Sequence, residues 1–168
     1  MDSQSEQFSQ IYDQYIEKIY RFVYLKVNSQ ETAEDIASKV FLSAWKAYSK
    51  PKKQIGNIGA FLYKIAGNAV IDYYREKDRT RTISADIVPE AMDTKSSLHD
   101  RAVLSADISI IKKAIQKLEK EQQNIIIWHY LEDMPIDDIA ELTGRPAGTI
   151  RVMLHRGLKD LKGLINES

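Results

Sequence analysis

The chain has 168 residues, about the length of one average domain, and its 24 Lys and Arg balance its 24 Asp and Glu. A hydrophobic fraction of 43% with a charged fraction of 29% is typical of a globular protein and excludes a disordered chain. The absence of cysteine excludes a disulfide framework, a thiolate metal site and a Cys nucleophile. The polar start and the short hydrophobic runs predict neither a signal peptide nor a membrane span, so we expect a cytoplasmic protein.

Apolar residues recur at helical spacing along the first half of the chain, and no run of two-residue alternation appears. Three apolar stripes predict three helices, within residues 8–23, 32–49 and 58–73. We assign Trp45 and Phe61 to the core of this part. The class predicted for the whole chain is therefore all-α.

Residues 79–102 lose this periodicity and collect Asp, Ser and Thr, as an extended linker does. Helical spacing resumes over residues 103–168, where four short helices fit. The sequence thus predicts two small helical domains, at 1–78 and 103–168, joined by a flexible linker at 79–102.

Charge is distributed unevenly within the second domain, although the chain as a whole is neutral. Residues 107–141 hold four lysines against eight acidic residues, whereas residues 145–162 hold five basic residues against one acidic residue. An acidic stretch is therefore followed directly by a basic one.

The junction of these two stretches predicts a helix-turn-helix. Gly144 tolerates the positive φ that ends a helix, and Pro146 is suited to the start of the next one. In the second helix, apolar side chains fall on one face and basic ones on the other. The predicted outer face carries Arg151, Val152, His155, Arg156 and Lys159.

A basic helix of this kind suits the DNA major groove, where phosphates and base edges accept from Arg and His and thymine methyls take apolar contacts. Val152, among basic residues, suits a methyl contact. The alternative is an ordinary amphipathic helix with a solvated basic face. The tight turn and the preceding acidic helix favour DNA binding.

Two sets of motifs carry a resemblance to a known family. Asp138–Gly144, Gly148–Arg151 and His155–Gly157 resemble region 4 of bacterial RNA polymerase sigma factors. Ala33–Ile36 with Val40–Trp45 resembles the region 2 helix that docks on the polymerase, and Phe61–Ala66 with Asn68 and Asp72 resembles the helix that opens the −10 element. With two regions and a short linker, the chain is similar to the extracytoplasmic-function (ECF) group.

The resemblance implies three sets of site residues. For the −35 element they are Arg145, Gly148, Thr149, Arg151, Val152, His155, Arg156 and Lys159. For the −10 element they are Lys53, Lys64, Asn68, Asp72 and Arg75. For polymerase docking they are Glu34, Asp35, Ser38, Lys39 and Leu42.

The function that the resemblance implies is promoter-specific transcription initiation with core RNA polymerase, without catalysis by the chain itself, a cofactor or a metal. The implied partners are core polymerase, promoter DNA and an anti-sigma factor, with no direct membrane association. A DNA-binding regulator that works without polymerase is the alternative. An enzyme is disfavoured because the three histidines are scattered and no P-loop or dinucleotide-binding glycine pattern exists.

Several residues depart from the family pattern. Ser38 and Lys39 stand where Gln and Glu are common, Pro135 stands where a capping Ser is common, and Val152 replaces a polar or basic residue. Tyr63 and Tyr74 are candidates for stacking on unpaired bases, although tyrosines at helical spacing are more often packing residues.

Overall fold

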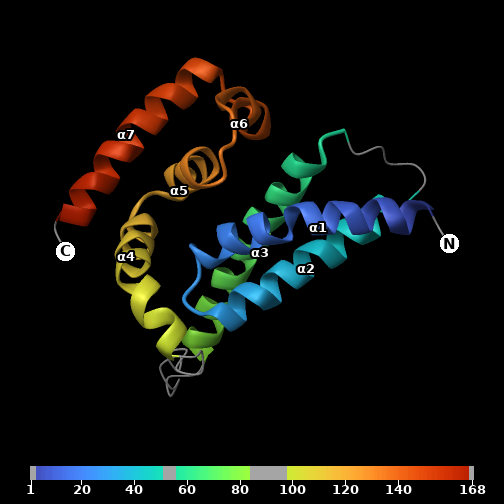
Figure 1. The fold of residues 1–168 in the computed structure, drawn as a ribbon, viewed down its shortest axis with the longest axis horizontal. Helices are drawn as coiled ribbons and strands as arrows, with labels where there is room; N and C mark the ends of the chain where they lie inside the picture. The colour runs from blue at the N-terminus through green and yellow to red at the C-terminus, as the bar shows by residue number, and fades with distance from the viewer. Residues whose placement is uncertain (1–2, 51–55, 84–97, 167–168) are drawn as a thin grey trace. The chain divides into compact units, whose positions relative to one another are not determined.

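The computed structural model describes residues 3–50, 56–83 and 98–166 (Figure 1). Every element in this part of the chain is a helix, which confirms the all-α prediction. The chain divides into two compact units, Met1–Thr94 and Lys95–Ser168. Among the described helices, none is both long and apolar enough to cross a lipid bilayer.

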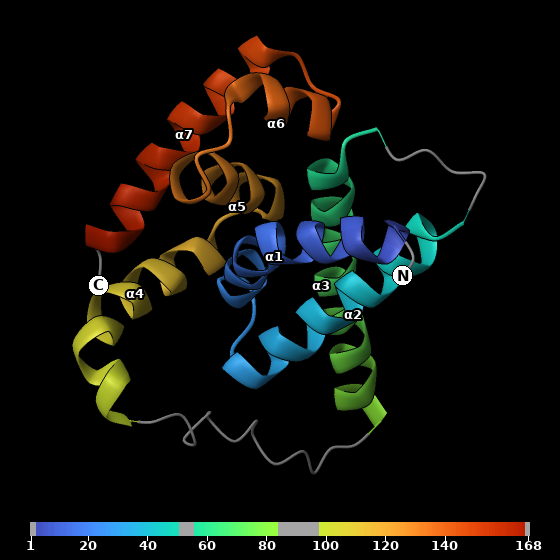
Figure 2. The ribbon, with the colours of Figure 1, turned by 45° about the vertical axis from the view of Figure 1, so that its right-hand side comes forward.

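The first unit contains α1 (Ser3–Tyr24), α2 (Gln30–Tyr48) and α3 (Ile58–Ile83). α1 and α2 lie side by side, and α3 crosses both (Figure 1, Figure 2). The turn before α2 is fixed by Ser29, whose Oγ accepts from the backbone N–H of Thr32 at 3.0 Å. This N-cap satisfies one of the donors that a helix start leaves open.

The three predicted apolar stripes form the core of this unit, because each helix turns its stripe toward the other two. The buried side chains are Ile19, Phe22, Val23, Ala33, Ile36, Ala37, Val40, Phe41, Ala44, Leu62, Tyr63, Ala66 and Val70. Trp45 and Phe61 are only half-buried, which places them at the edge of the core. Trp45 packs there against Phe8, with ring centroids 5.2 Å apart.

Both tyrosines considered for base stacking are packing residues. Tyr63 is buried, and its ring meets Phe22 edge-on at 5.5 Å between centroids. Tyr74 donates its hydroxyl to the carbonyl of Lys26 at 2.5 Å, which ties α3 to the connection between α1 and α2. The packing alternative from the sequence is therefore the one the structure supports.

The second unit contains α4 (Leu98–Lys117), α5 (Lys120–Ile126), a π-helical turn η1 (Ile127–Leu131), α6 (Ile136–Thr143) and α7 (Ala147–Asn166). Its buried apolar side chains come from all of these elements: Ala114, Ile115, Leu118, Ile125, Ile126, Ile127, Trp128, Ile139, Ile150, Leu154 and Leu161. α7 contacts α4, α5 and α6. It is therefore the helix around which this small core is built.

The ends of the predicted linker at 79–102 are helical in the structure. α3 extends to Ile83, and α4 begins at Leu98. Residues 84–97 lie outside the described part of the chain. The domain boundaries predicted from the sequence, at 78 and 103, stay a prediction.

α7 approaches α5 most closely at a glycine. Gly157 is buried, and a Cβ built on it would lie 3.2 Å from two side-chain carbons of Ile126. One turn further along, Gln122 of α5 donates its amide to Asp160 of α7 at 3.2 Å. α5 thus contacts α7 at two neighbouring points, and at the first a side chain larger than that of glycine would press on Ile126.

We expect Gly157→Val to destabilise the protein by about 1–3 kcal/mol, because the added carbons overpack the contact with Ile126. Gly163→Val is the matched control, since Gly163 lies on the same helix and a Cβ added to it would have no neighbour within 4 Å. The control is expected to change stability by less than about 0.5 kcal/mol. Urea unfolding of the full chain measures both, and equal stability of the two variants would contradict the contact.

Candidate nucleic-acid interface

The connection between α6 and α7 is a tight turn that ends one helix and starts the next within three residues. Gly144 has φ 74° and ψ 14°, the left-handed conformation, and its N–H donates to the carbonyl of Ala140 at 2.9 Å. α7 begins at Ala147, and the carbonyl of Pro146 accepts from Ile150 N–H at 3.1 Å. Both sequence signals are confirmed, with Pro146 directly before the first helical residue.

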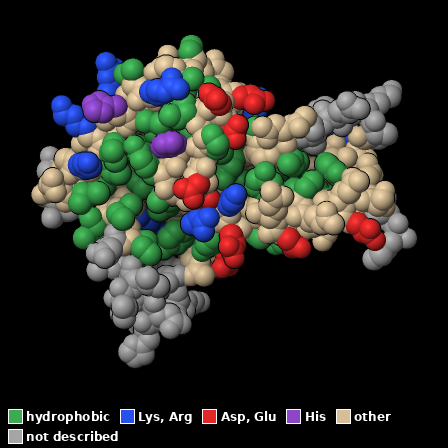
Figure 3. All heavy atoms as spheres, turned by 45° about the horizontal axis from the view of Figure 1, so that its top comes forward, with side chains coloured by type: hydrophobic (Ala, Val, Ile, Leu, Met, Phe, Trp, Pro, Cys, Tyr) green, Lys and Arg blue, Asp and Glu red, His purple; other side chains and the backbone are tan. Residues whose placement is uncertain are grey.

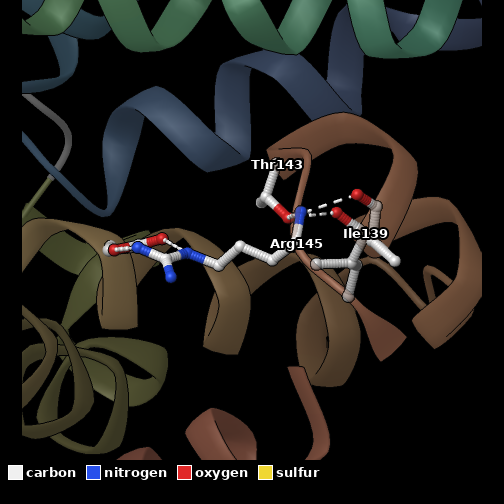
Figure 4. Close-up of polar contacts among 5 residues, drawn as sticks. Ile139, Thr143 and Arg145 are labelled. Carbon is white, nitrogen blue, oxygen red and sulfur yellow. Dashed lines mark hydrogen bonds and ion pairs between the residues drawn. The ribbon is translucent and has the colours of Figure 1, made fainter. Parts of the chain in front are cut away.

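Thr143 ties the end of α6 to the turn (Figure 4). Its hydroxyl donates to the carbonyl of Ile139 at 2.8 Å and accepts from the backbone N–H of Arg145 at 3.3 Å. One side chain therefore satisfies a carbonyl at the helix end and a donor in the turn. The backbone at Arg145 is held in place by this contact.

The start of α6 has no side-chain cap and carries two acidic residues in its first turn. Pro135 occupies the N-cap position and makes no side-chain hydrogen bond, and its carbonyl accepts from Ile139 N–H at 3.1 Å. Asp137 and Asp138 lie in the first turn, where negative charge is stabilised by the helix dipole. Part of the acidic stretch therefore stabilises the first helix of the motif.

α7 separates its side chains as predicted. Ile150, Leu154 and Leu161 are buried, whereas the basic residues and His155 on the other face are exposed. Val152 is 48% exposed among them. Lys, Arg and His side chains gather on the surface over α7 (Figure 3). Of the predicted −35 residues the exposed ones are Arg145, Gly148, Arg151, Val152, His155, Arg156 and Lys159, and Thr149 is half-buried.

Arg145 differs from the other predicted −35 residues because its charged group already has a partner. Its guanidinium binds Glu121 of α5 through two parallel hydrogen bonds, from Nε to Oε1 and from Nη2 to Oε2, the second 2.9 Å long. These hydrogen bonds and the charge of Glu121 raise the pKa of Arg145 above its usual value. The side chain therefore points toward Glu121 on α5 (Figure 4).

The predicted −10 residues of α3 lie along one exposed stripe. Lys64, Asn68, Asp72 and Arg75 are all exposed, at spacings of three and four residues. Asp72 and Arg75 form an ion pair at 3.7 Å. Lys53 lies outside the described residues. The stripe thus combines cations with an amide that can hydrogen-bond a base.

The predicted polymerase-docking residues lie together on the outer face of α2. Glu34, Asp35, Ser38, Lys39 and Leu42 are all exposed, and Lys39 pairs with Asp35 at 3.4 Å. An open depression beside them is lined by Glu31, Thr32, Glu34, Asp35 and Ser38. Leu42 is 55% exposed. The face therefore joins an acidic hollow to an exposed apolar side chain.

Among the described residues, no group of three or more His, Asp or Glu side chains is arranged to hold a metal ion.

Comparison with known families matches both halves of the chain. Residues 11–80 match sigma-70 region 2, and residues 108–161 match sigma-70 region 4. Together these ranges cover most of the sequence. The chain belongs to the sigma-70 family.

Two relatives of this chain are sigma factors of the ECF group. ECF RNA polymerase sigma factor BldN of Streptomyces coelicolor is 26% identical over 96% of this chain, which spans 61% of that protein. ECF RNA polymerase sigma factor SigW of Bacillus subtilis is 29% identical over 92% of this chain and 87% of its own length. The sequence-based assignment to the ECF group is confirmed.

A solved structure shares the fold. The sigma factor RpoE from Bartonella quintana, determined in complex with the anti-sigma factor NepR, aligns with a TM-score of 0.74. It is 22% identical to this chain, and the alignment covers 96% of this chain and 98% of that one.

Three contacts important for the geometry of region 4, made by Thr143, Glu121 and Gly157, were not predicted from the sequence. Thr143 had a detectable signal, since a Thr before a helix-ending glycine can bond back to the preceding turn. The role of Glu121 had no signal in the sequence, because its partner Arg145 is 24 residues away. The close approach at Gly157 also had none, since a glycine in a helix does not reveal what lies opposite.

The left-handed conformation of Gly144, in the turn between α6 and α7, allows a direct test of backbone strain. We expect Gly144→Ala to destabilise the chain by about 1–2 kcal/mol, the usual cost of a left-handed conformation for a residue with a Cβ. Packing does not contribute, because nothing lies within 4 Å of a Cβ at this position. Gly144→Asn is expected to cost less, since Asn adopts this conformation more readily. Urea unfolding compares the three chains, and wild-type stability of Gly144→Ala would refute the strain argument.

Proposed function

We propose that this sigma factor binds core RNA polymerase through region 2 and directs initiation at promoters that it recognises through their −35 and −10 elements. The observation that carries the proposal is the pairing, in one chain, of a region 4 helix-turn-helix that has an exposed basic face with a region 2 in which α2 exposes the residues predicted to dock. The basic face of α7 alone, or the outer face of α2 alone, would also suit other kinds of protein. The two together suit a protein that brings polymerase to DNA.

In the −35 step, α7 enters the major groove, which is wide enough for one helix. The first N–H groups of α7, at Gly148 and Thr149, face the phosphates. Arg151, Arg156 and Lys159 supply cations, and His155 supplies a further donor. Val152 makes an apolar contact, for which a thymine methyl is the matching group.

In the −10 step, the stripe on α3 holds a separated DNA strand. Lys64 and Arg75 follow the phosphate backbone, while Asn68 hydrogen-bonds an unpaired base. Asp72 already pairs with Arg75, so it orients that cation along the stripe. Lys53 is assigned to the same step from the sequence alone.

Polymerase docking uses the outer face of α2. Leu42 is the apolar centre of the face, and Glu34 and Asp35 supply charge around it. Lys39 pairs with Asp35, so the exchange of a common Glu for Lys at this position reduces the negative charge of the face. We therefore expect docking that depends on the apolar contact more than on ion pairs.

The remaining parts of the proposal follow from family membership. The chain acts in the cytoplasm as a regulatory subunit, without catalysis of its own and without a cofactor. An anti-sigma factor is a proposed partner, supported by the complex in which the RpoE structure was determined.

We expect Leu42→Asp to weaken binding to core polymerase by about tenfold or more, the loss typical of a central apolar interface residue. Stability is expected to stay unchanged, because Leu42 is more exposed than buried. Ser43→Asp introduces the same side chain at the neighbouring exposed position, outside the proposed docking set, and is expected to bind normally. Pull-down titration with core polymerase measures both, and equal binding of the two variants would remove Leu42 from the interface.

Run-off transcription with core polymerase, on a set of promoters with and without the protein, tests the function as a whole. We expect the wild-type chain to direct initiation, and Arg151→Ala and Arg156→Ala to weaken it while the fold stays intact. Lys113→Ala is the control, since it removes an exposed cation from α4 of the same unit. Full activity of both arginine variants would remove α7 as the recognition helix. Tight, specific promoter binding without polymerase would favour the polymerase-independent regulator.

A further inference from the structure

Glu121 and Arg145 form an ion pair with a geometry unlike that of most surface pairs. Two parallel N–H···O bonds join the guanidinium to both carboxylate oxygens. The Arg145 and Glu121 side chains are 45% and 42% exposed, so the pair is partly shielded from water. Bidentate arginine–carboxylate pairs are the surface ion pairs that fix geometry, whereas single contacts between exposed charges contribute little.

The pair lies at the point where the course of α7 is decided. Arg145 is two residues before Ala147, at which α7 begins. Its backbone N–H is held by Thr143, which in turn is bound to the carbonyl of Ile139. The residue is thus fixed from both ends, by α6 through its backbone and by α5 through its side chain.

α5 supplies the surface on which the whole motif is seated. Glu121 binds the turn, Gln122 binds Asp160 of α7, and Ile126 packs against Gly157 of α7. The last two contacts hold the middle of α7, and only the first holds the segment that leads into it. Of these three contacts, the ion pair is therefore the one that sets where α7 begins relative to α5.

We propose that Arg145 is a positioning residue for −35 recognition, which Glu121 holds on α5 to fix the start of α7, and that its guanidinium does not contact DNA. The inference rests on the proposed function and refines the −35 set, from which it removes Arg145. The side chains left to contact the element are those of α7 itself. Glu121 becomes, with Arg145, a residue that sets promoter affinity without touching the promoter.

A charge exchange separates positioning from direct contact. Arg145→Glu and Glu121→Arg each place two like charges together, and we expect each to weaken binding of the holoenzyme to a −35-dependent promoter about fivefold. The double variant Glu121→Arg/Arg145→Glu restores an ion pair with reversed polarity, and we expect affinity within about twofold of wild type. Affinity of the double variant as low as that of Arg145→Glu would overturn the proposal.

Salt dependence gives a second readout, which a change in stability alone does not move. Each phosphate contact contributes about 0.9 to the slope of log affinity against log salt. We expect Arg145→Gln to lower affinity and to leave this slope unchanged. A slope reduced by about 0.9 would identify a direct phosphate contact and overturn the proposal. Circular dichroism at the assay temperature checks that every variant is folded.

A double-mutant cycle on the free chain tests the pair without polymerase. Urea unfolding of wild type, Glu121→Gln, Arg145→Gln and the double variant is expected to show coupling between the two positions. Strictly additive effects would mean that the pair does not hold the turn. Failure of the wild-type chain in run-off transcription would refute the proposed function, whereas normal wild-type activity with an unrescued charge exchange would refute only the positioning role.

Discussion

Each helix of this small protein buries one apolar stripe, and that burial decides which side chains remain for partners. In α2 the stripe through Ile36 and Val40 faces α1 and α3, which leaves Leu42 and the acidic residues outside. In α7 the stripe through Ile150 and Leu154 does the same for the basic face. Because a helix rotates 100° per residue, the orientation of one buried residue fixes that of all the others. The functional faces are therefore consequences of the core.

For this reason the buried and the exposed faces of the helices could be predicted from the sequence. Periodicity alone assigned the inside and the outside of α7, and Gly144 marked the turn before it. Periodicity did not reveal what each outer face binds. A solvated charged face and a docking face have the same pattern, so the assignment of Glu34, Asp35 and Leu42 came from the family resemblance.

Contacts between residues far apart in the sequence could not be predicted from it. Periodicity describes neighbours at three and four residues, whereas the partner of Arg145 is 24 residues away and that of Gly157 is on another helix. The family resemblance and the basic stretch placed Arg145 with the DNA-contacting residues, since nothing in the sequence shows that its guanidinium is engaged. The helical ends of the predicted linker were missed for a related reason. α3 ends at Ile83 and α4 begins at Leu98. The residues beside these two positions are mostly polar, so no apolar stripe marks the helix ends.

Contacts made by acidic residues help to explain why the net charge of the chain is zero. Glu121 neutralises Arg145, and Asp137 and Asp138 stabilise the uncapped start of α6, so several acidic residues of the second unit have structural roles. Long-range attraction to DNA depends on net charge, whereas close contact depends on the local face. A neutral chain is therefore attracted weakly to DNA in general, while the basic face of α7 keeps local positive charge for a groove into which it is placed. Such a division suits a protein whose delivery to the promoter depends on the polymerase.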